Sequence, residues 1–209
     1  MHPSLGSMPL VAILRGIRPG EAAAVGDALA EAGFRILEVP MNSPEPLRSI
    51  EVLAKRLPRC LVGAGTVLQA GQVAAVRDAG GQLVVAPNLD AEVVRASLTA
   101  GLIPMPGVAT PTEAFAALAA GAPCLKVFPA EGIPPAVLKA WRAVLPARVP
   151  LLPVGGITAE SMGDYLAAGA SGFGLGSALY RAGDDPATVG ERAMRFVSTW
   201  QALHGRLVT

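Results

Sequence analysis

The chain has 209 residues, of which 52% are hydrophobic and 16% charged, and its formal net charge is +1 at pH 7. This length is typical of one domain with a sizeable core, and we expect a single domain over residues 1–209. The near-neutral charge has no block of one sign, which argues against nucleic acid or a membrane as partner, and glycines interrupt every long uncharged stretch.

The cysteines and histidines narrow the class of protein further. Cys60 and Cys124 both lie in apolar runs, which is typical of reduced core thiols in a cytosolic protein. The N-terminus lacks the basic segment of a signal peptide, so we expect a cytoplasmic location. The histidines, His2 and His204, lie near the two ends, which argues against a serine–histidine triad and a histidine-bound metal. We expect no metal and no cofactor.

Short apolar runs alternate along the chain with alanine-rich segments of helical periodicity. Thr110-Pro111-Thr112-Glu113 combines a capping box with proline at the first helical position, and Ser43-Pro44 resembles another helix start. Five alanine-rich segments end in Ala-Gly, where a helix needs a left-handed cap: Gly33, Gly80, Gly101, Gly121 and Gly169. The apolar runs cover residues 10–14, 36–40, 61–64, 83–87, 102–106, 125–128, 150–154 and 172–175.

These eight strand–helix units predict an α/β fold, namely a compact (β/α)8 TIM barrel whose last helix covers residues 186–204. An open doubly wound sheet is the alternative. In a barrel, chemistry takes place at the carboxyl ends of the strands. The residues that end each apolar run are therefore the candidates for a functional site.

Lys126 is the first candidate. The chain has three lysines against fourteen arginines, yet Lys126 lies in the middle of an apolar run. A desolvated lysine, unlike arginine, can lose its proton and form an imine. We interpret Lys126 as a Schiff-base nucleophile. The alternative is a lysine whose stem packs while its ammonium group reaches water.

Glu38 is a second lone charge in an apolar run, at the end of the second strand. A buried carboxylate needs a partner or a proton, because an unpaired buried charge is very unfavourable. Together with Lys126 it predicts an acid–base group that faces a nucleophilic amine. The alternative is a structural Glu38–Lys126 ion pair, but buried pairs are weak evidence for stability.

Other strand ends predict the groups that hold a substrate. Barrels often bind phosphate in the last two strand–helix loops, although glycine also serves ordinary turns. Arg181 is close behind the second of these loops, and we interpret it as a surface or interface charge. Arg15 is suited to a carboxylate or to Glu38, with a rim salt bridge as the alternative. The remaining candidates are Gly155, Gly156, Gly176 and Ser177 for phosphate, Thr66 for a carboxylate or carbonyl, and Pro87 and Phe128 as pocket wall or plain core.

Several of these segments resemble those of one family, in the same order and over nearly the whole chain. The motifs are Leu37-Glu38-Val39, Gly63-Ala64-Gly65-Thr66-Val67, Pro111-Thr112-Glu113, Leu125-Lys126-Val127-Phe128-Pro129-Ala130 and Gly155-Gly156-Ile157. They are similar to those of the class I 2-keto-3-deoxy-6-phosphogluconate aldolase family. The branch that acts on the phosphogalactonate substrate is more similar still, through Ala12-Ile13-Leu14-Arg15-Gly16-Ile17, Glu38-Val39-Pro40-Met41-Asn42-Ser43-Pro44 and Gly174-Leu175-Gly176-Ser177-Ala178-Leu179-Tyr180-Arg181.

The resemblance implies a lyase that needs no metal and cleaves 2-dehydro-3-deoxy-6-phosphogalactonate to pyruvate and D-glyceraldehyde 3-phosphate. Lys126 matches the imine-forming lysine and Glu38 the general acid–base. Arg15 and Thr66 would meet the pyruvoyl carboxylate, and the two glycine segments the phosphate. A homotrimer is typical of the family. Alternative substrates are 2-dehydro-3-deoxy-6-phosphogluconate and 4-hydroxy-2-oxoglutarate.

Two positions depart from the phosphogluconate pattern. Asn42 stands where that branch has an arginine, and we hypothesise that Arg15 takes over its carboxylate-binding role. Val154 stands where that branch tends to have threonine. Valine cannot hydrogen-bond the C4 hydroxyl group at which the two substrates differ, so we expect a galacto preference with some activity on the gluco epimer.

Two other functions fit parts of the pattern. In a sugar-phosphate isomerase or epimerase, Lys126 would bind charge without forming an imine. In a ligand-binding sensor, the scaffold would bind pyruvate or phosphate without turnover. The presence of both Glu38 and Lys126 favours the aldolase.

Overall fold

A computed structural model describes Leu5 and residues 8–207, and it describes no side chains beyond His204. His2 lies outside these residues. The strands are β1 (Leu10–Ile13), β2 (Ile36–Pro40), β3 (Leu61–Gly65), β4 (Leu83–Val85), β5 (Ile103–Met105), β6 (Gly107–Val108), β7 (Leu125–Val127), β8 (Leu151–Pro153) and β9 (Phe173–Leu175). The helices are α1 (Pro19–Ala32), α2 (Pro46–Arg56), α3 (Gln72–Asp78), α4 (Ala91–Thr99), α5 (Pro111–Ala119), α6 (Pro135–Arg142), α7 (Met162–Ala167) and α8 (Pro186–Leu207), with a short 3-10 turn η2 (Ala130–Gly132).

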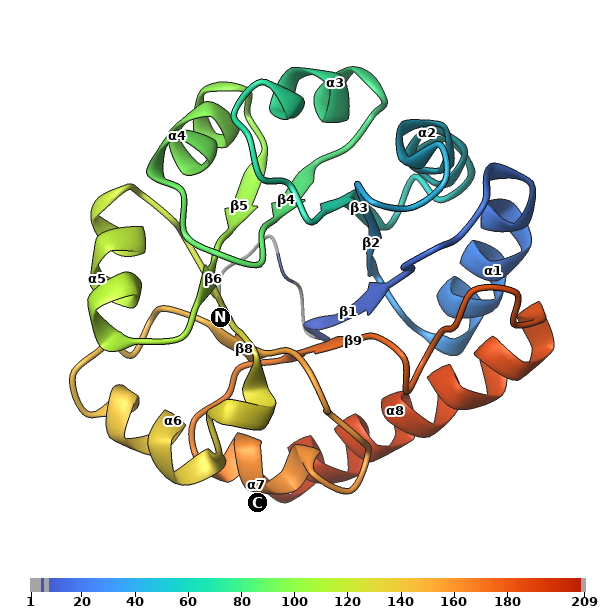
Figure 1. Ribbon diagram of the computed structural model, residues 1–209. Coiled ribbons are helices and arrows are strands. Elements are labelled where there is room, and N and C mark those ends of the chain that lie inside the picture. The colour runs from blue at the N-terminus through green and yellow to red at the C-terminus, as the bar shows by residue number, and fades with distance from the viewer. Residues whose placement is uncertain (1–4, 6–7, 208–209) are drawn as a thin grey trace.

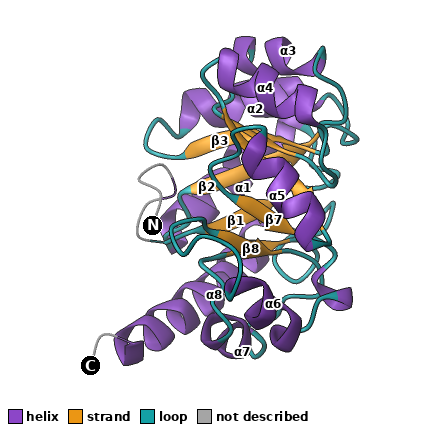
Figure 2. Ribbon diagram, turned by 90° about the vertical axis from the view of Figure 1, so that its left-hand side faces the viewer, coloured by secondary structure: helices purple, strands orange, loops and turns teal. Residues whose placement is uncertain are grey.

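The strands form two parallel sheets that together describe a ring, with the helices on its outside (Figure 1). The six-stranded sheet has the order β5-β4-β3-β2-β1-β9, and the three-stranded sheet the order β6-β7-β8. Seen from the side, the strands lie between helices (Figure 2). The predicted α/β fold is confirmed. The strand order lacks the reversal that a doubly wound sheet requires, so that alternative is wrong.

The division into two sheets departs from the single set of eight strands that the sequence predicts. The run at 102–106 ends at Pro106, which has no backbone N–H to donate to a neighbouring strand. β5 on one side of Pro106 pairs with β4, and β6 on the other side pairs with β7. On the far side of the ring, a single parallel bridge between Val154 and Gly174 links the two sheets.

The ends of the helices follow the sequence with one exception. Thr110 forms the predicted capping box with Glu113 at the start of α5. The five predicted cap glycines all have positive φ angles: Gly33 114°, Gly80 85°, Gly101 76°, Gly121 101° and Gly169 98°. The start predicted at Ser43-Pro44 is wrong, because α2 begins at Pro46. The Ser43 hydroxyl group instead accepts a hydrogen bond of 2.9 Å from the Gly16 N–H.

Strand alternation decides which side chains face the centre of the ring. A compact apolar cluster occupies that inner face: Leu5, Val11, Ile36, Leu83, Val85, Met105, Cys124 and Leu152. Alternate residues of a strand point to the same side. Glu38 follows Ile36 by two residues and Lys126 follows Cys124 by two, so both charged side chains lie on this inner face, nearer the carboxyl ends of their strands.

The larger apolar cluster packs between the strands and the surrounding helices. Cys60 and Cys124 are both buried and unpaired, in agreement with the expectation of reduced thiols. Within the described part of the chain, no helix combines the length and apolar character that crossing a membrane requires.

Candidate active site

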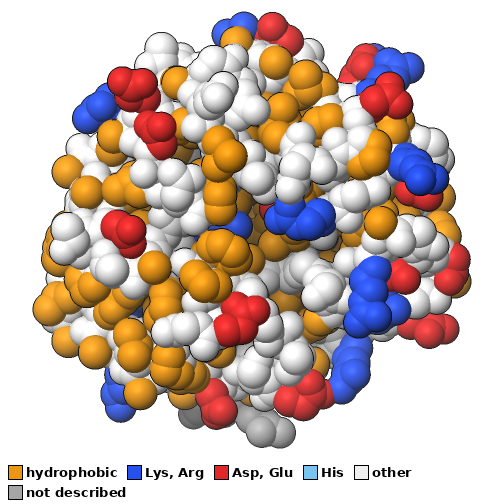
Figure 3. Space-filling view, viewed as in Figure 1, with side chains coloured by type: hydrophobic (Ala, Val, Ile, Leu, Met, Phe, Trp, Pro, Cys, Tyr) orange, Lys and Arg blue, Asp and Glu red, His pale blue; other side chains and the backbone are white. Residues whose placement is uncertain are grey.

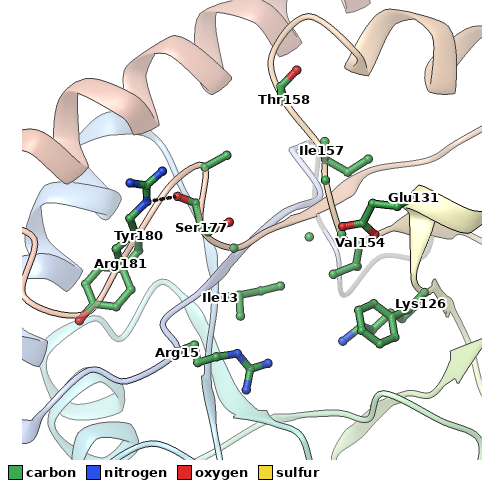
Figure 4. A pocket seen from close by; sticks show the side chains of 16 residues that line it. Ile13, Arg15, Lys126, Glu131, Val154, Ile157, Thr158, Ser177, Tyr180 and Arg181 are labelled. Atoms are coloured by element: carbon green, nitrogen blue, oxygen red, sulfur yellow. Dashed lines mark hydrogen bonds between the residues drawn. The ribbon is translucent and has the colours of Figure 1, made fainter.

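A cavity of about 540 Å³ opens among the carboxyl ends of β1, β7, β8 and β9. It brings together eight of the eleven residues that the sequence singled out: Arg15, Lys126, Phe128, Val154, Gly155, Gly156, Gly176 and Ser177. Glu38, Thr66 and Pro87 do not line it. Figure 3 shows Lys and Arg side chains near the centre of one face of the molecule, and Figure 4 shows how the lining side chains lie.

Lys126 is only 5% exposed, and its Nζ atom lies 4.5 Å from the centre of the Phe128 ring. Burial lowers the pKa of Lys126, the charge of Glu38 raises it, and Arg15 lowers it again. An amine with a lowered pKa is more often neutral, which is the nucleophilic form. The small exposure does not fit the alternative of an ammonium group held out in water.

Glu38 is 1% exposed, and β2 places it between Ile13 of β1 and Gly63 of β3. Its Oε2 atom has no hydrogen-bond partner, and no salt bridge joins it to Lys126, so the alternative of a structural ion pair is not observed. Burial raises the pKa of Glu38 to about 7, while the charges of Lys126 and Arg15 lower it. A carboxyl group with this pKa can both accept and donate a proton at neutral pH.

Arg15 projects into the cavity from the end of β1, toward the region that Lys126 also faces (Figure 4). Its Nη1 atom donates a hydrogen bond of 2.6 Å to the side-chain oxygen of Asn42. Arg15 makes no salt bridge with any described residue, so the rim salt bridge is not observed. Its guanidinium group therefore keeps donors for an anionic ligand.

Thr66 directly follows β3 and Pro87 lies two residues after β4, close to where the sequence predicts them, but both lie outside the cavity wall. Thr66 has a φ angle of 54°, in the left-handed region that a β-branched residue rarely adopts. Residues with such backbone strain cluster at functional sites. Pro87 is partly buried, and its carbonyl lies against Gly107.

The loops after β8 and β9 form the other end of the cavity. Gly155 and Gly156 have φ angles of 105° and 63°, which glycine adopts without strain. The Nε atom of Arg181 donates a hydrogen bond of 3.1 Å to the backbone oxygen of Ser177 (Figure 4). Arg181 is exposed, as the sequence predicts, and it also lines the cavity, a position that the sequence did not indicate.

Glu131 is a cavity residue that sequence reasoning missed. Its side chain covers the Gly155-Gly156 backbone, so closely that a Cβ atom on Gly156 would lie 2.8 Å from its Cγ atom. Figure 4 shows this carboxylate beside Val154. The signal was available, because Glu131 lies in η2, the short turn beyond the carboxyl end of the Lys126 strand.

The arrangement defines a class of site. A buried amine of lowered pKa shares its surroundings with a buried carboxyl group of pKa about 7. Glycine-rich loops and two arginines, Arg15 and Arg181, surround the same cavity. These are the parts needed for covalent chemistry on the carbonyl group of an anionic substrate. No group of three or more possible metal ligands occurs among Leu5 and residues 8–207.

Comparison with known proteins identifies the family. The model of the KDPG and KHG aldolase family matches residues 2–189. The chain therefore belongs to the KDPG and KHG aldolase family, whose members are lyases.

Two relatives match almost the whole chain. A probable 2-dehydro-3-deoxy-6-phosphogalactonate aldolase of Rhizobium meliloti (strain 1021) is 48% identical over 198 residues, 94% of this chain and 93% of the relative. A 2-dehydro-3-deoxy-6-phosphogalactonate aldolase of Escherichia coli (strain K12) is 45% identical over 195 residues, 93% of this chain and 95% of the relative.

Solved structures agree with this similarity. One described as native KDPGal has a TM-score of 0.94 and 44% identity, and the match covers 95% of this chain and 97% of the other. A cube-shaped cage designed by fusing symmetric oligomeric domains has a TM-score of 0.94 and 43% identity over 96% of this chain and 74% of the other. The KDPG aldolase of Legionella pneumophila, with pyruvate captured as a covalent carbinolamine, has a TM-score of 0.79 and 28% identity over 96% of both chains.

Proposed function

We propose that this protein cleaves 2-dehydro-3-deoxy-6-phosphogalactonate to pyruvate and D-glyceraldehyde 3-phosphate through a Schiff base on Lys126. The observation that carries the proposal is the buried Lys126 amine, 5% exposed and of lowered pKa, in the wall of the cavity. The two relatives at 48% and 45% identity support the substrate, because both are named for this phosphogalactonate.

The first step joins enzyme and substrate. The neutral Lys126 amine attacks the C2 ketone and forms a carbinolamine, which takes up one proton from solvent and loses water to give an iminium ion. The carbinolamine captured with pyruvate in the Legionella relative supports this step. The positively charged iminium ion then withdraws electrons from the C3–C4 bond.

The second step breaks that bond. The Glu38 carboxylate takes the proton of the C4 hydroxyl group, directly or through one water molecule. The C3–C4 electrons move to the iminium ion and form an enamine, and glyceraldehyde 3-phosphate leaves. The enamine takes a proton at C3, supplied by the Glu38 carboxyl group, and hydrolysis then releases pyruvate and restores the amine.

The remaining cavity residues hold the substrate along its length. Arg15 binds the pyruvoyl carboxylate, and the strained Thr66 backbone supports a role for its hydroxyl group at the same end. The backbone of Gly155, Gly156 and Gly176 and the Ser177 hydroxyl group bind the phosphate. Phe128 packs beside Lys126, and Val154 faces C4. Pro87 stays a prediction, because it lies outside the cavity wall.

Exposed apolar side chains over α5 and α6 support a proposal for the assembly. We propose a homotrimer that uses the apolar surface over α5 and α6, and Figure 3 shows hydrophobic side chains gathered on that side. Phe115, Val137 and Val144 are 47%, 39% and 58% exposed there. Exposed apolar patches of this kind mark interaction sites. The designed cage built from symmetric oligomeric domains supports self-association.

We further propose that the two sheets close into one (β/α)8 barrel that forms a single domain. Only Pro106 separates β5 from β6, and the Val154–Gly174 bridge links β8 to β9, which supports closure on both sides. A cytoplasmic location is supported by the buried, unpaired cysteines.

Borohydride trapping tests the imine. The protein is incubated with pyruvate and sodium borohydride, its intact mass is measured, and the modified peptide is mapped. We expect a lactyl-sized adduct on Lys126 and none in Lys126→Arg, because arginine does not form the imine. A folded wild-type protein without an adduct would remove the aldolase proposal and favour a phosphate-binding isomerase or epimerase.

A further inference from the structure

The loop after β2 is joined to the loop after β1 by two hydrogen bonds. The Arg15 Nη1 atom donates to the Asn42 side-chain oxygen at 2.6 Å, and the Gly16 N–H donates to the Ser43 hydroxyl oxygen at 2.9 Å. The Met41 N–H in turn donates to the Gly65 carbonyl at 2.7 Å, which ties this loop to the end of β3. The loop after β2, the strand that carries Glu38, is therefore joined to Arg15 and Gly16 on one side and to the end of β3 on the other.

Asn42 orients the Arg15 guanidinium group without neutralising it. An amide oxygen accepts a hydrogen bond but carries no net charge, whereas an aspartate at this position would form an ion pair. Asn42 is exposed, and the hydrogen bond to Arg15 is the one that its side chain makes with the described residues. The positive charge of Arg15 is thus held over the cavity and left available.

That charge acts on both candidate catalytic groups. Arg15 lowers the pKa of Glu38 and the pKa of Lys126. In each case its effect is smaller than that of burial and that of the charge interaction between Glu38 and Lys126. A mobile Arg15 would spend part of its time in water, where its charge is screened. Fixing the side chain therefore matters for substrate binding and for the protonation of the site.

We propose that Asn42 is a positioning residue, which holds Arg15 where it binds the substrate carboxylate and where its charge reaches Glu38 and Lys126. This inference rests on the proposed aldolase function and adds a residue to it. Removal of the Asn42 amide should weaken carboxylate binding. It should also raise the pKa of both catalytic groups, because both lose part of the nearby positive charge.

The test compares Asn42→Ala, Asn42→Asp and Asn42→Gln with the wild type in steady-state cleavage over a range of pH. We expect KM to rise about tenfold in Asn42→Ala, the equivalent of one hydrogen bond to a charged group, and the pH profile of kcat/KM to move to higher pH. Asn42→Asp should raise KM further, because it neutralises Arg15. Asn42→Gln should recover part of the loss, because it restores an amide acceptor.

Two controls separate positioning from a general effect. Asn88 is also exposed and also follows a strand, but its side chain makes no hydrogen bond with a described residue, so Asn88→Ala should keep the wild-type KM and pH profile. In an Arg15→Ala background, Asn42→Ala should cause no further loss. If Asn42→Ala alone keeps the wild-type KM and pH profile, the inference is wrong. Pyruvate trapping of the wild type, measured in parallel, reports separately on the aldolase function.

Discussion

The Glu38 carboxylate occupies the space that a side chain at Gly65 would need. A Cβ atom on Gly65 would overlap both carboxylate oxygens of Glu38. β2 and β3 pair in regular parallel register at this point, so the close approach is not caused by a break in the sheet. Glycine at this point of β3 is therefore what allows a buried carboxyl group on the neighbouring strand. The proposed acid–base role of Glu38 therefore depends on the absence of a Cβ atom at Gly65.

Gly65→Ala should displace the Glu38 carboxylate and lower kcat by about 100-fold or more, the scale of a lost general acid–base group. Pyruvate trapping at Lys126 should persist, because it does not need the C4 proton transfer. Gly71→Ala is the matched control, since a Cβ atom there meets no atom within 4 Å and its φ angle is −63°. Wild-type kcat in Gly65→Ala would show that Glu38 is not the acid–base group.

Glu38 should make stability fall as the pH rises toward neutrality. Its pKa is raised from 4.5 to about 7 in the folded protein, so between these values the folded state binds more protons than the unfolded state. The folded state is then favoured at low pH by up to about 3 kcal/mol, and this advantage is lost as the pH rises through the window. Urea unfolding at about pH 5 and about pH 8 measures the difference, which should shrink in Glu38→Gln. An equal pH dependence in wild type and variant would contradict the raised pKa.

Glu38 should also set the pH dependence of the reaction. Its carboxylate form takes the C4 proton, so kcat/KM for cleavage should increase with pH and level off above about pH 7. The measurement is a kcat/KM profile of the wild type beside Glu38→Asp, which keeps a titrating group at a different position. A profile without an inflection near neutrality would argue against proton transfer by Glu38.

Thr66→Gly should separate stability from function. Thr66 has a φ angle of 54°, and glycine adopts this angle without strain. Glycine also gives the unfolded chain more conformational entropy, which offsets part of this gain. The net stabilisation should be up to about 1 kcal/mol. Loss of the hydroxyl group should at the same time raise KM. Thermal melting and steady-state kinetics measure the two effects. Thr66→Ser keeps the hydroxyl group and serves as the control, and an unchanged KM in Thr66→Gly would remove Thr66 from the binding site.

Val154→Thr should shift the substrate preference toward the gluco epimer. Val154 lines the cavity, and its side chain lies so close to Gly174 that a Cβ atom there would be 2.6 Å from Val154 Cγ2. Threonine has almost the same shape, so the change adds a hydroxyl group with little repacking. We expect the gluco-to-galacto ratio of kcat/KM to rise by up to about tenfold, the scale of one hydrogen bond. An unchanged ratio would mean that C4 is recognised elsewhere.

Phe115→Glu should weaken the proposed trimer. Phe115 is 47% exposed on α5 within the apolar surface over α5 and α6, and a charge there would be buried in an interface. Analytical ultracentrifugation should find a trimer for the wild type and smaller species for the variant. Met194→Glu, at a residue 56% exposed on α8, is the matched control and should remain trimeric. A trimeric Phe115→Glu would place the interface on another surface.

Much of the fold follows from local sequence. The cap glycines, the Thr110 capping box and the eight apolar runs depend on the conformational preferences of a few neighbouring residues. Glu38 and Lys126 could be singled out for the same reason, because a lone charge in an apolar strand is visible within five residues of sequence. Even the break at Pro106 had a local cause, the missing N–H group.

Only the tertiary structure decided which of these residues meet and at what distance. Arg15 and Asn42 are 27 residues apart in the sequence, and their contact depends on how the loops of two paired strands pack. The same holds for Glu131 over Gly155-Gly156, and for Glu38 and Lys126, which share an inner face without forming a salt bridge. The physical reason is that periodicity and capping act within one segment, whereas these distances depend on the twist, register and packing of the whole ring of strands.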